Sequence, residues 1–315
     1  MLLKNKLSEY VLRDLICNAL KEDIGSGDIT TELLIPKNKV IKAVIILKEK
    51  AVIAGLEIAQ KVFRRIDKNI QFKVCSTDGS LEKPGKIIAK VEGKAGSILS
   101  GERTVLNFLS HLSGVATVTR SFVDQVKPHK VKIMDTRKTI PGLRELEKYA
   151  VVLGGGYNHR MGLWDAVLVK DNHIAVLRAL GRGINIKDIA RLVKTRKPQG
   201  MSRPKEPGSR FILSGKVDIE VRNLKEFQEV LQIPPDIIML DNMNIDDIKK
   251  AVQMRNAEGG RRKAKIEVSG GVHLGNVKAI AQTGVDMISI GALAHSVKAV
   301  DMSLEVYLKG SESFY

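Results

Sequence analysis

The stretch VKIMDTRKT at Val131–Thr139 joins a short apolar run to two adjacent cations. Its first four residues have the composition of a buried strand, and Asp135, Arg137 and Lys138 follow at once. A helix starting at this point would disfavour cations, because the N-terminal end of a helix carries partial positive charge. The stretch therefore predicts a core strand that ends in a binding site for an anion.

Five more apolar runs follow downstream, each separated from the next by enough chain for a helix. This alternation predicts an α/β fold with a parallel sheet, either open or closed into a barrel. In a barrel, the C-terminal ends of the strands surround the active site. One polar residue at such an end is an ordinary helix cap, whereas six at one edge indicate a binding site. The residues at the six strand ends are Asp135, Lys170, Glu220, Asp241, Ser269 and Gly291.

The last two strand ends carry small residues that would let backbone N–H groups approach a phosphate. SGGV spans Ser269–Val272, and IGAL spans Ile290–Leu293. Barrels frequently bind phosphate after their last two strands. A single pair of glycines is more often a turn, so the prediction depends on both ends together.

The first third of the chain has a different pattern. Residues 11–20 repeat apolar residues at helical spacing, and 41–55 and 86–92 have the composition of strands. Residues 100–126 have a helical pattern with Gly114 as either a break or a close-packing point. A small α+β unit and a linking helix are therefore expected before the sheet.

Composition limits the class of protein. The chain has 315 residues, of which 43% are apolar, enough for one large domain or two. No secretion signal and no run of eighteen apolar residues is visible, so a cytoplasmic protein is expected. Cys17 and Cys75 are far apart, which argues against a disulfide scaffold or a zinc module and favours two buried thiols.

The net charge of +17 is concentrated in one segment. Between Arg178 and Lys216 lie eleven Lys or Arg residues and two acidic ones, which is more than half of the excess. This basic insertion includes a stretch rich in Pro and Gly, which indicates a solvated loop. Proteins that bind single-stranded nucleic acid use stacking rings, and none lies within TRKPQGMSRPKEPGSR at 195–210. A nucleic-acid partner is therefore disfavoured, and a nucleic-acid binder is the alternative from a different class.

Several long motifs occur in order: EDIGSGDITT, SGERTVLNFLSHLSGVAT, DTRKTIPGLRELEKYAVVLGGGYNHRMGLWDAVLVKDNHI, LDN, SGG and GALAHS. With these motifs the chain closely resembles the quinolinate phosphoribosyltransferases, also called nicotinate-nucleotide pyrophosphorylases (carboxylating), from about Glu22 to Ser296. The resemblance implies an N-terminal α/β sandwich domain at 1–112, with a tail at about 297–315 packed on it. It also implies an incomplete α/β barrel of about seven strands at 113–296, which the basic insertion at about 178–216 interrupts.

The resemblance also implies a reaction. In the family, phosphoribosyl pyrophosphate and quinolinate give nicotinate mononucleotide, pyrophosphate and carbon dioxide in de novo NAD biosynthesis, with Mg²⁺ as cofactor. The family's homodimer lets one subunit cover its partner's barrel mouth, and further assembly into a hexamer is left open. A related phosphoribosyltransferase acting on a different anion, such as a molybdenum-associated homologue, is the alternative among enzymes. No membrane partner is expected.

The motif positions assign residues to this chemistry. Quinolinate is a planar dianion, which forked and permanently charged arginines suit. Carboxylates stabilise the positive charge that develops on the ribose, and they bind Mg²⁺ directly or through water. The resemblance assigns quinolinate binding to Arg103 (entering the partner's site), Thr136, Arg137, His159, Arg160 and Lys170. It assigns catalysis to Lys138, Glu220 and Asp241, and the metal to Glu220 and Asp241.

A further set of residues is assigned to phosphoribosyl pyrophosphate. The backbone at the last two strand ends would cradle phosphate, while Lys138 would neutralise phosphate oxygens. This set is Lys138, Glu220, Asp241, Ser269, Gly270, Gly271, Ile290, Gly291, Ala292 and His295. One departure is Ala294, where the family often has Thr, so a hydroxyl contact beside His295 is missing.

Overall fold

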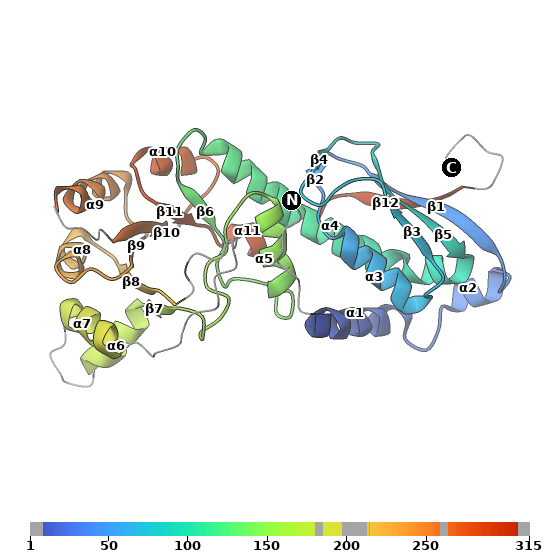
Figure 1. Cartoon of the computed structure of the whole chain (residues 1–315), viewed down its shortest axis with the longest axis horizontal. Coiled ribbons are helices and arrows are strands. Elements are labelled where there is room, and N and C mark those ends of the chain that lie inside the picture. The colour runs from blue at the N-terminus through green and yellow to red at the C-terminus, as the bar shows by residue number, and fades with distance from the viewer. Residues whose placement is uncertain (1–8, 180–184, 197–212, 214, 259–263, 308–315) are drawn as a thin grey trace. The chain divides into compact units, whose positions relative to one another are not determined.

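The computed structural model describes residues 9–179, 185–196, 213, 215–258 and 264–307 (Figure 1). These residues divide into two compact units. The first unit takes the described parts of 1–120, 140–155 and 296–315, and the second takes those of 121–139 and 156–295. The division crosses helix α4 (Ala95–Gln125), whereas the sequence places the domain boundary at 112/113. No described helix is long and apolar enough to cross a membrane.

The first unit is built on a four-stranded antiparallel sheet. Its strand order is β12 (Met302–Tyr307), β1 (Val40–Leu47), β5 (Ile87–Lys94) and β3 (Gln71–Val74). A second small sheet pairs β2 (Ala51–Val52) with β4 (Leu81–Glu82). The strands expected within 41–55 and 86–92 are confirmed. The chain up to residue 307 returns to this unit, because β12 pairs with β1 in the register Leu47↔Met302.

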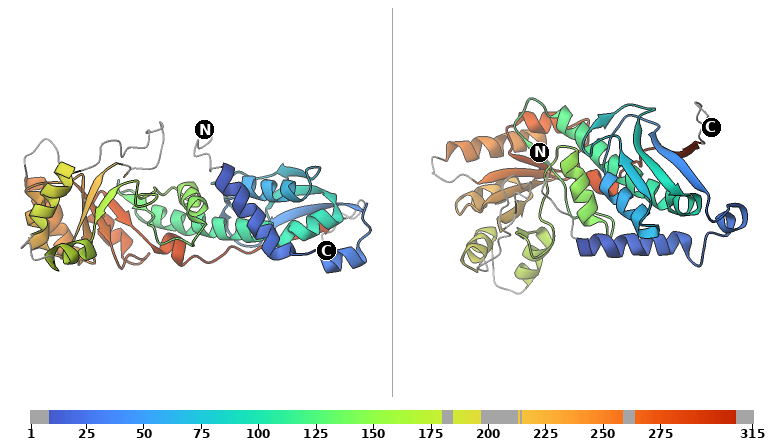
Figure 2. Two further views of the ribbon diagram at one scale, coloured as in Figure 1. Left: turned by 90° about the horizontal axis from the view of Figure 1, so that it is seen from below. Right: turned by 45° about the vertical axis from the view of Figure 1, so that its right-hand side comes forward.

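Helices complete the first unit. They are α1 (Glu9–Ile24), α2 (Ile29–Leu34), α3 (Leu56–Ile66), most of α4 and α5 (Arg144–Leu153). Helix α1 packs on α3, as Figures 1 and 2 show. Phe63 of α3 reaches Phe72 of β3, with 6.0 Å between ring centroids, so this helix packs on the sheet. Cys17 and Cys75 are free and partly exposed, so the expectation of two buried thiols is wrong.

Helix α4 runs for 31 residues without a break at Gly114. A Cβ atom added to Gly114 would overlap the backbone carbonyl oxygen of Lys298 in the same unit. The glycine is therefore a close-packing point, where the helix touches the chain that leads into β12.

The second unit contains the parallel sheet that the sequence predicts. All six expected strands are present, and each pairs in parallel with its neighbours. Tyr157 adds a parallel bridge to Met134, on the side of the first strand that the sheet leaves open. This bridge takes the place of a seventh strand and supports the expected incomplete barrel. The order is β6 (Lys132–Met134), β11 (Met287–Ser289), β10 (Lys265–Ser269), β9 (Ile237–Asp241), β8 (Val217–Val221) and β7 (Val167–Val169).

Helices follow the strands around the outside of the sheet, and α7, α8, α9 and α10 pack in succession (Figure 1). Of the basic insertion at 178–216, residues 180–184, 197–212 and 214 lie outside the described residues. The helices of this unit are α6 (Asp171–Ala179), α7 (Ile186–Arg196), α8 (Leu224–Leu231), α9 (Ile245–Ala257), α10 (Val277–Gln282) and α11 (Ala292–His295).

The interpretation of the two strand-end cation sites needs one correction. Helix α6 begins at Asp171, immediately after Lys170, so this cation does precede a helix. The next helix after Arg137 and Lys138 begins only at Arg144, so the helix-dipole part of that prediction is wrong for the pair. An anion site at Arg137 therefore depends on the contacts of the Arg137 side chain and not on a helix dipole.

We expect Gly114→Ala to destabilise the protein. Alanine normally stabilises a helix interior relative to glycine by about 0.5–1 kcal/mol, but here its methyl group would meet backbone. A net loss of about 1–3 kcal/mol is expected, because overpacking forces the backbone to move. Urea unfolding would measure it. Gly96→Ala is the matched control on the same helix, since its methyl group would meet only the tip of Thr31 at 3.3 Å. A stabilised Gly114→Ala would contradict the close packing.

Candidate functional site

The register of the parallel sheet brings the predicted strand-end residues to one edge. Asp241 pairs with Ser269, and Val169 pairs with Ile219, which places Lys170 beside Glu220. Ser289 pairs with Met134, and the N–H of Ile290 donates to the Met134 carbonyl at 2.9 Å. Residues that are more than 100 positions apart in the chain therefore lie at the same edge.

The loop after β6 holds a cation, Arg137, with two buried nitrogens that make no hydrogen bond in the described chain. Nε and Nη1 of Arg137 are buried, and neither has a partner among the described residues. Thr136 shapes the loop, because its hydroxyl accepts a hydrogen bond from the Lys138 N–H at 3.0 Å. Buried N–H donors of a guanidinium are costly unless an anion completes their hydrogen bonds. Lys138 itself is exposed.

Within the GGGYNHR segment, residues 157–160 are a fixed part of the second unit. Asp135 accepts hydrogen bonds from the His159 N–H at 2.8 Å and from the Asn158 side chain at 2.6 Å. Nη1 of Arg160 donates to the Ala166 carbonyl at 3.0 Å. His159 is only 4% exposed and Arg160 only 6%, so both side chains are packed into the unit.

Two arginines of the site influence each other. Burial lowers the pKa of Arg160, and the positive charge of Arg137 lowers that pKa further. Asp218 and Asp165 act in the opposite direction. Because the two guanidinium groups repel, a ligand with two negative charges would relieve the repulsion.

Two carboxylates, Glu220 and Asp241, lie at the same edge beside a third cation, Lys170. Oε2 of Glu220 is 3.9 Å from Nζ of Lys170. Burial raises the pKa of Glu220, and the neighbouring Asp241 carboxylate raises it further. Two carboxylates that repel in this way suit a hard divalent cation, which prefers oxygen ligands.

The phosphate-type loops after β9 and β10 interlock. Gly270 (φ +87°) and Gly271 (φ +62°) have left-handed backbone, and a Cβ on Gly270 would overlap the Asn242 amide. Asn242 is itself left-handed, at φ 53°. Its N–H donates to the Ser269 carbonyl at 2.9 Å, and its Nδ2 donates to Asp241 at 2.9 Å. Asn242 therefore joins two predicted site residues, although sequence reasoning did not select it.

The last strand end brings three predicted phosphate residues together. A Cβ on Gly291 would lie 3.0 Å from Nε2 of His295 and 3.0 Å from Cδ of Lys138. Ile290 is buried and Ala292 starts the short helix α11. Ala294 is only 5% exposed, so it faces the interior.

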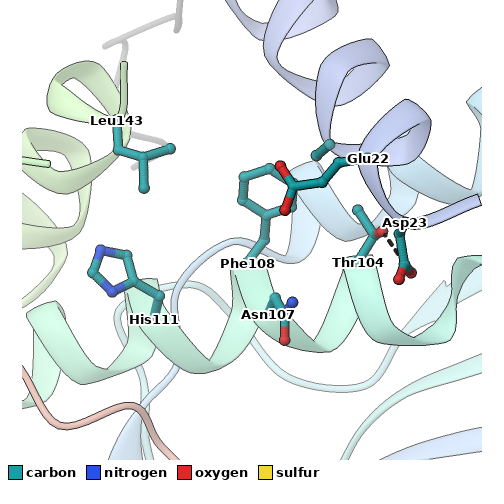
Figure 3. Close-up of a pocket in the computed structure, with 8 residues that line it drawn as sticks. Glu22, Asp23, Thr104, Asn107, Phe108, His111 and Leu143 are labelled. Carbon is teal, nitrogen blue, oxygen red and sulfur yellow. Dashed lines mark hydrogen bonds between the residues drawn. The ribbon is translucent and has the colours of Figure 1, made fainter. Parts of the chain in front are cut away.

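One predicted site residue lies in the other unit. Arg103 is exposed on α4 of the first unit, and its entry into a partner's site stays a prediction. That unit has a pocket of about 270 Å³ (Figure 3). None of the predicted site residues lines it. Its lining residues are Ala19, Glu22, Asp23, Thr104, Asn107, Phe108, His111 and Leu143.

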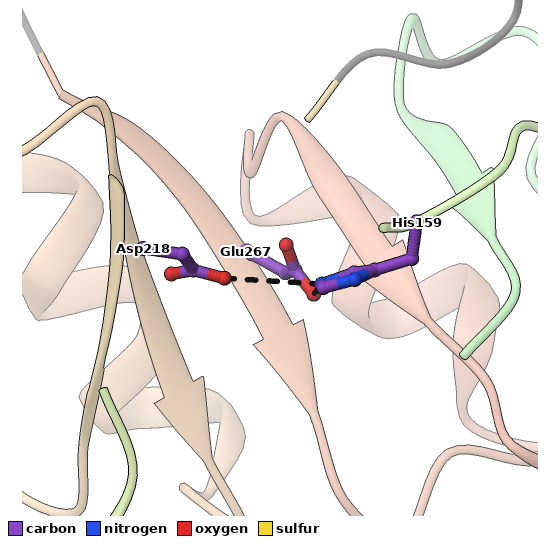
Figure 4. Close-up of side chains that lie close together, drawn as sticks. All are labelled: His159, Asp218 and Glu267. Carbon is purple, nitrogen blue, oxygen red and sulfur yellow. Dashed lines mark ion pairs between the residues drawn. The ribbon is translucent and has the colours of Figure 1, made fainter. Parts of the chain in front are cut away.

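Two buried acids that sequence reasoning missed lie behind the site. Asp218 of β8 is 1% exposed, and Glu267 of β10 is fully buried. Both face the ring of His159, as Figure 4 shows: Nε2 is 3.3 Å from Oε1 of Glu267 and 3.9 Å from Oδ2 of Asp218. The sequence does carry a signal for these two acids, because side chains two positions apart along a strand lie on the same face. Asp218 therefore shares a face with Glu220, and Glu267 shares a face with Ser269.

Comparison with known proteins assigns both parts of the chain to one family. The family model for the quinolinate phosphoribosyl transferase C-terminal domain matches residues 115–305, and the N-terminal domain model matches residues 28–113. The chain belongs to the quinolinate phosphoribosyltransferase family. A probable nicotinate-nucleotide pyrophosphorylase [carboxylating] of Methanocaldococcus jannaschii is 41% identical, over 95% of this chain and 98% of the relative. The corresponding Bacillus subtilis protein is 37% identical, over 96% of each chain.

Solved structures of the same family share the fold over nearly the whole chain. The nicotinate-nucleotide pyrophosphorylase of Francisella tularensis has a TM-score of 0.84 and 38% identity, covering 96% of this chain and 98% of its own. The protein of the same name from Ehrlichia chaffeensis has a TM-score of 0.82 and 39% identity, covering 96% and 100%. The two-unit architecture is therefore that of the quinolinate phosphoribosyltransferases.

We expect Asp218→Asn to change how stability depends on pH. Burial raises the pKa of Asp218, and the neighbouring Glu267 and Glu220 carboxylates raise it further. The folded protein thus keeps a proton that the unfolded chain releases above about pH 4, and folding stability falls as pH rises towards the raised pKa. Asparagine removes this loss, so the unfolding free energy of the variant minus that of the wild type should increase from pH 4.5 to pH 7.5.

Urea unfolding at the two pH values would measure that difference. Asp124→Asn serves as control, because the Asp124 side chain is 50% exposed on the same unit. A wild-type-to-variant difference that is the same at both pH values, as expected for the control, would mean that Asp218 is not held protonated.

Proposed function

We propose that this protein transfers the phosphoribosyl group of phosphoribosyl pyrophosphate to quinolinate and releases carbon dioxide. The products are nicotinate mononucleotide and pyrophosphate, and the step belongs to de novo NAD biosynthesis. The observation that supports it most directly is the pair Arg137 and Arg160, two neighbouring cations of which Arg137 has two buried nitrogens without a hydrogen bond in the described chain. The Glu220 and Asp241 carboxylates lie at the same edge of the sheet, with Lys170 beside Glu220. The relatives' names, nicotinate-nucleotide pyrophosphorylase and quinolinate phosphoribosyltransferase [decarboxylating], agree with it.

Quinolinate would be bound by the cationic part of the site. Its two carboxylates lie on adjacent ring carbons, so they need donors from more than one direction. Arg137 and Arg160 supply forked donors, and Lys170 supplies a point charge at the next strand end. Thr136 and His159 complete the quinolinate wall. Arg103 would come from the partner subunit of a homodimer.

The phosphorylated sugar would occupy the other half of the edge. Lys138 and His295 neutralise phosphate oxygens beside Gly291, where the absence of a side chain lets both of them approach the backbone. The backbone at Ser269, Gly270 and Gly271 offers N–H donors in the left-handed turn that Asn242 braces. Ile290 and Ala292 contribute backbone around the same phosphate.

Transfer requires the bond between ribose C1′ and the pyrophosphate oxygen to break as the pyridine nitrogen bonds to C1′. Glu220 and Asp241 would stabilise positive charge on the ribose and hold its hydroxyls. These carboxylates fit Mg²⁺, because burial and then the neighbouring Asp241 carboxylate raise the pKa of Glu220, and a cation would relieve both effects. Bound there directly or through water, the ion would neutralise the departing pyrophosphate.

Decarboxylation needs orientation more than a nucleophile. Ribosylation gives the ring nitrogen a positive charge, so breaking the bond from C2 to its carboxylate leaves an electron pair that the adjacent nitrogen stabilises. A proton then adds to C2. The protein's task is to hold the substrate without over-stabilising the departing carboxylate.

The assay that tests the proposal measures two products together. Purified protein with Mg²⁺, quinolinate and phosphoribosyl pyrophosphate should release carbon dioxide and form nicotinate mononucleotide in equal amounts. Product from nicotinate with none from quinolinate would assign the protein to a different phosphoribosyl transfer. For the nucleic-acid alternative, a gel shift across salt concentrations should show no tight binding that depends on 178–216.

Arg137→Ala should weaken quinolinate binding selectively. Hydrogen bonds to charged groups contribute about 1.5–3 kcal/mol, so the KM for quinolinate should rise by about tenfold or more. The KM for phosphoribosyl pyrophosphate should stay within about twofold, because Lys138 and the glycine loops are intact. Steady-state kinetics in each substrate would measure both values. Arg178→Ala, an exposed arginine on α6, is the matched control. Equal rises in both KM values would contradict the assigned role.

Asp241→Asn should weaken the response to Mg²⁺. Loss of one carboxylate charge from the proposed metal site should raise the Mg²⁺ concentration for half-maximal activity by about tenfold. The measurement is initial rate against Mg²⁺ at saturating substrates. Asp246→Asn is the control, because the Asp246 side chain is 83% exposed on α9. An unchanged Mg²⁺ response would remove Asp241 from the metal site.

A further inference from the structure

One nitrogen of the His159 ring accepts a hydrogen bond, and the other lies within ion-pair distance of two buried acids. The backbone N–H of Arg160 donates to Nδ1 at 2.8 Å. A ring nitrogen that accepts a hydrogen bond carries no proton, so the proton of a neutral ring is on Nε2. That nitrogen points to the two buried acids, with Oε1 of Glu267 at 3.3 Å and Oδ2 of Asp218 at 3.9 Å (Figure 4).

The same three side chains could be taken for a metal site. Their ligand atoms lie within 4.8 Å of one another, and histidine with two carboxylates is a common ligand set. A histidine that binds a metal through Nε2 must give up the proton there, and its Nδ1 then carries the proton and donates. Here Nδ1 accepts from Arg160. The tautomer therefore favours an N–H that faces an acid over a nitrogen that faces a metal.

Glu267 is itself held in place from the next strand. The Ser289 hydroxyl of β11 donates to Oε1 of Glu267 at 2.5 Å. This is the oxygen that lies closest to His159. Glu267 and Ser289 are both buried, so water does not compete for these contacts.

His159 links Glu267 to Arg160, which is itself held by several hydrogen bonds. The Arg160 N–H donates to His159, and the Arg160 guanidinium donates to the Ala166 carbonyl at 3.0 Å. The next residue is also fixed, because the Met161 N–H donates to Asp165 at 2.7 Å. A change in the His159 ring would therefore be felt first by the backbone of Arg160.

We propose that Glu267 is a positioning residue, which holds the His159 ring in the Nε2–H tautomer so that Nδ1 fixes Arg160 for binding a substrate carboxylate. Asp218 supports the same ring from β8. His159 then contributes to the quinolinate site mainly through Arg160, because its ring proton faces Glu267. The kinetic consequence rests on the proposed function, whereas the tautomer does not.

Nitrogen NMR of protein labelled at its six histidines tests the tautomer without any substrate. The His159 signals would be assigned by their loss in His159→Asn. Wild type should show a protonated Nε2 and an unprotonated Nδ1. A protonated Nδ1, or a ring protonated on both nitrogens, would overturn the proposal. Added Zn²⁺ should leave the Nε2 proton in place, and its loss would show a metal site instead.

Three variants separate positioning from general damage. Glu267→Leu keeps the approximate size and removes the acceptor, and Glu267→Gln keeps an acceptor for both His159 and Ser289. Ser289→Ala removes the other contact to the same oxygen without touching His159. Glu267→Leu should mix the two ring tautomers, while the other two variants keep the wild-type tautomer. An unchanged tautomer in Glu267→Leu would overturn the proposal.

Steady-state kinetics give the functional readout. Glu267→Leu should raise the KM for quinolinate by about tenfold with the KM for phosphoribosyl pyrophosphate within about twofold, and Glu267→Gln should restore the wild-type ratio. The same rise in Ser289→Ala, or equal rises for both substrates, would count against positioning. Should wild type fail to use quinolinate, the proposed function falls, while the tautomer measurement still decides the role of Glu267. If Glu267→Leu does not fold, the tautomers of wild type and Glu267→Gln remain decisive.

Discussion

Parallel pairing in a fixed register is the constraint on which the site depends. Asp241 faces Ser269, and Lys170 lies beside Glu220, because their strands pair at defined positions. A slip of one residue would turn every side chain of a strand to the opposite face. The charged side chains would then face the helices outside the sheet instead of the site. The apolar residues of β8 and β9, buried along nearly their whole length, hold that register. Packing of the core and placement of the charges are thus one requirement.

Charge is arranged in layers behind this edge. The strand ends carry the exposed Lys138 and Lys170, the partly buried Asp241 and the buried Glu220. Behind them, Asp218, Glu267 and His159 are almost fully buried. Buried ionisable groups weaken a fold unless they are paired, so a folded chain that keeps them gives up stability for a preorganised site. Arg137 is the clearest case, because its buried Nε and Nη1 donate no hydrogen bond within the described chain.

The sequence was sufficient for the elements with strong local signals. Six parallel strands could be predicted, because each is an apolar run with polar residues at its C-terminal end. Strand β3 could not, because Gln71–Val74 has no buried face, and β4 has only two residues. At the site, strand-end residues followed from the fold, whereas Asn242 depends on a left-handed backbone shared between two loops. The contact of His159 with Glu267 joins residues 108 positions apart, which periodicity alone cannot pair.

The open side of the barrel has a consequence for the protein in a crowded solution. Among the described residues, no further strand pairs with the sheet beyond the Tyr157 bridge. An unpaired strand edge can pair with a strand of another molecule. Here the carboxylates of Asp135 and Asp165 accept from the N–H groups of His159 and Met161. Side chains thereby occupy donors that a neighbouring strand would need. The side chains that fix this loop beside the anion site thus also leave the edge with fewer N–H groups for pairing with another strand.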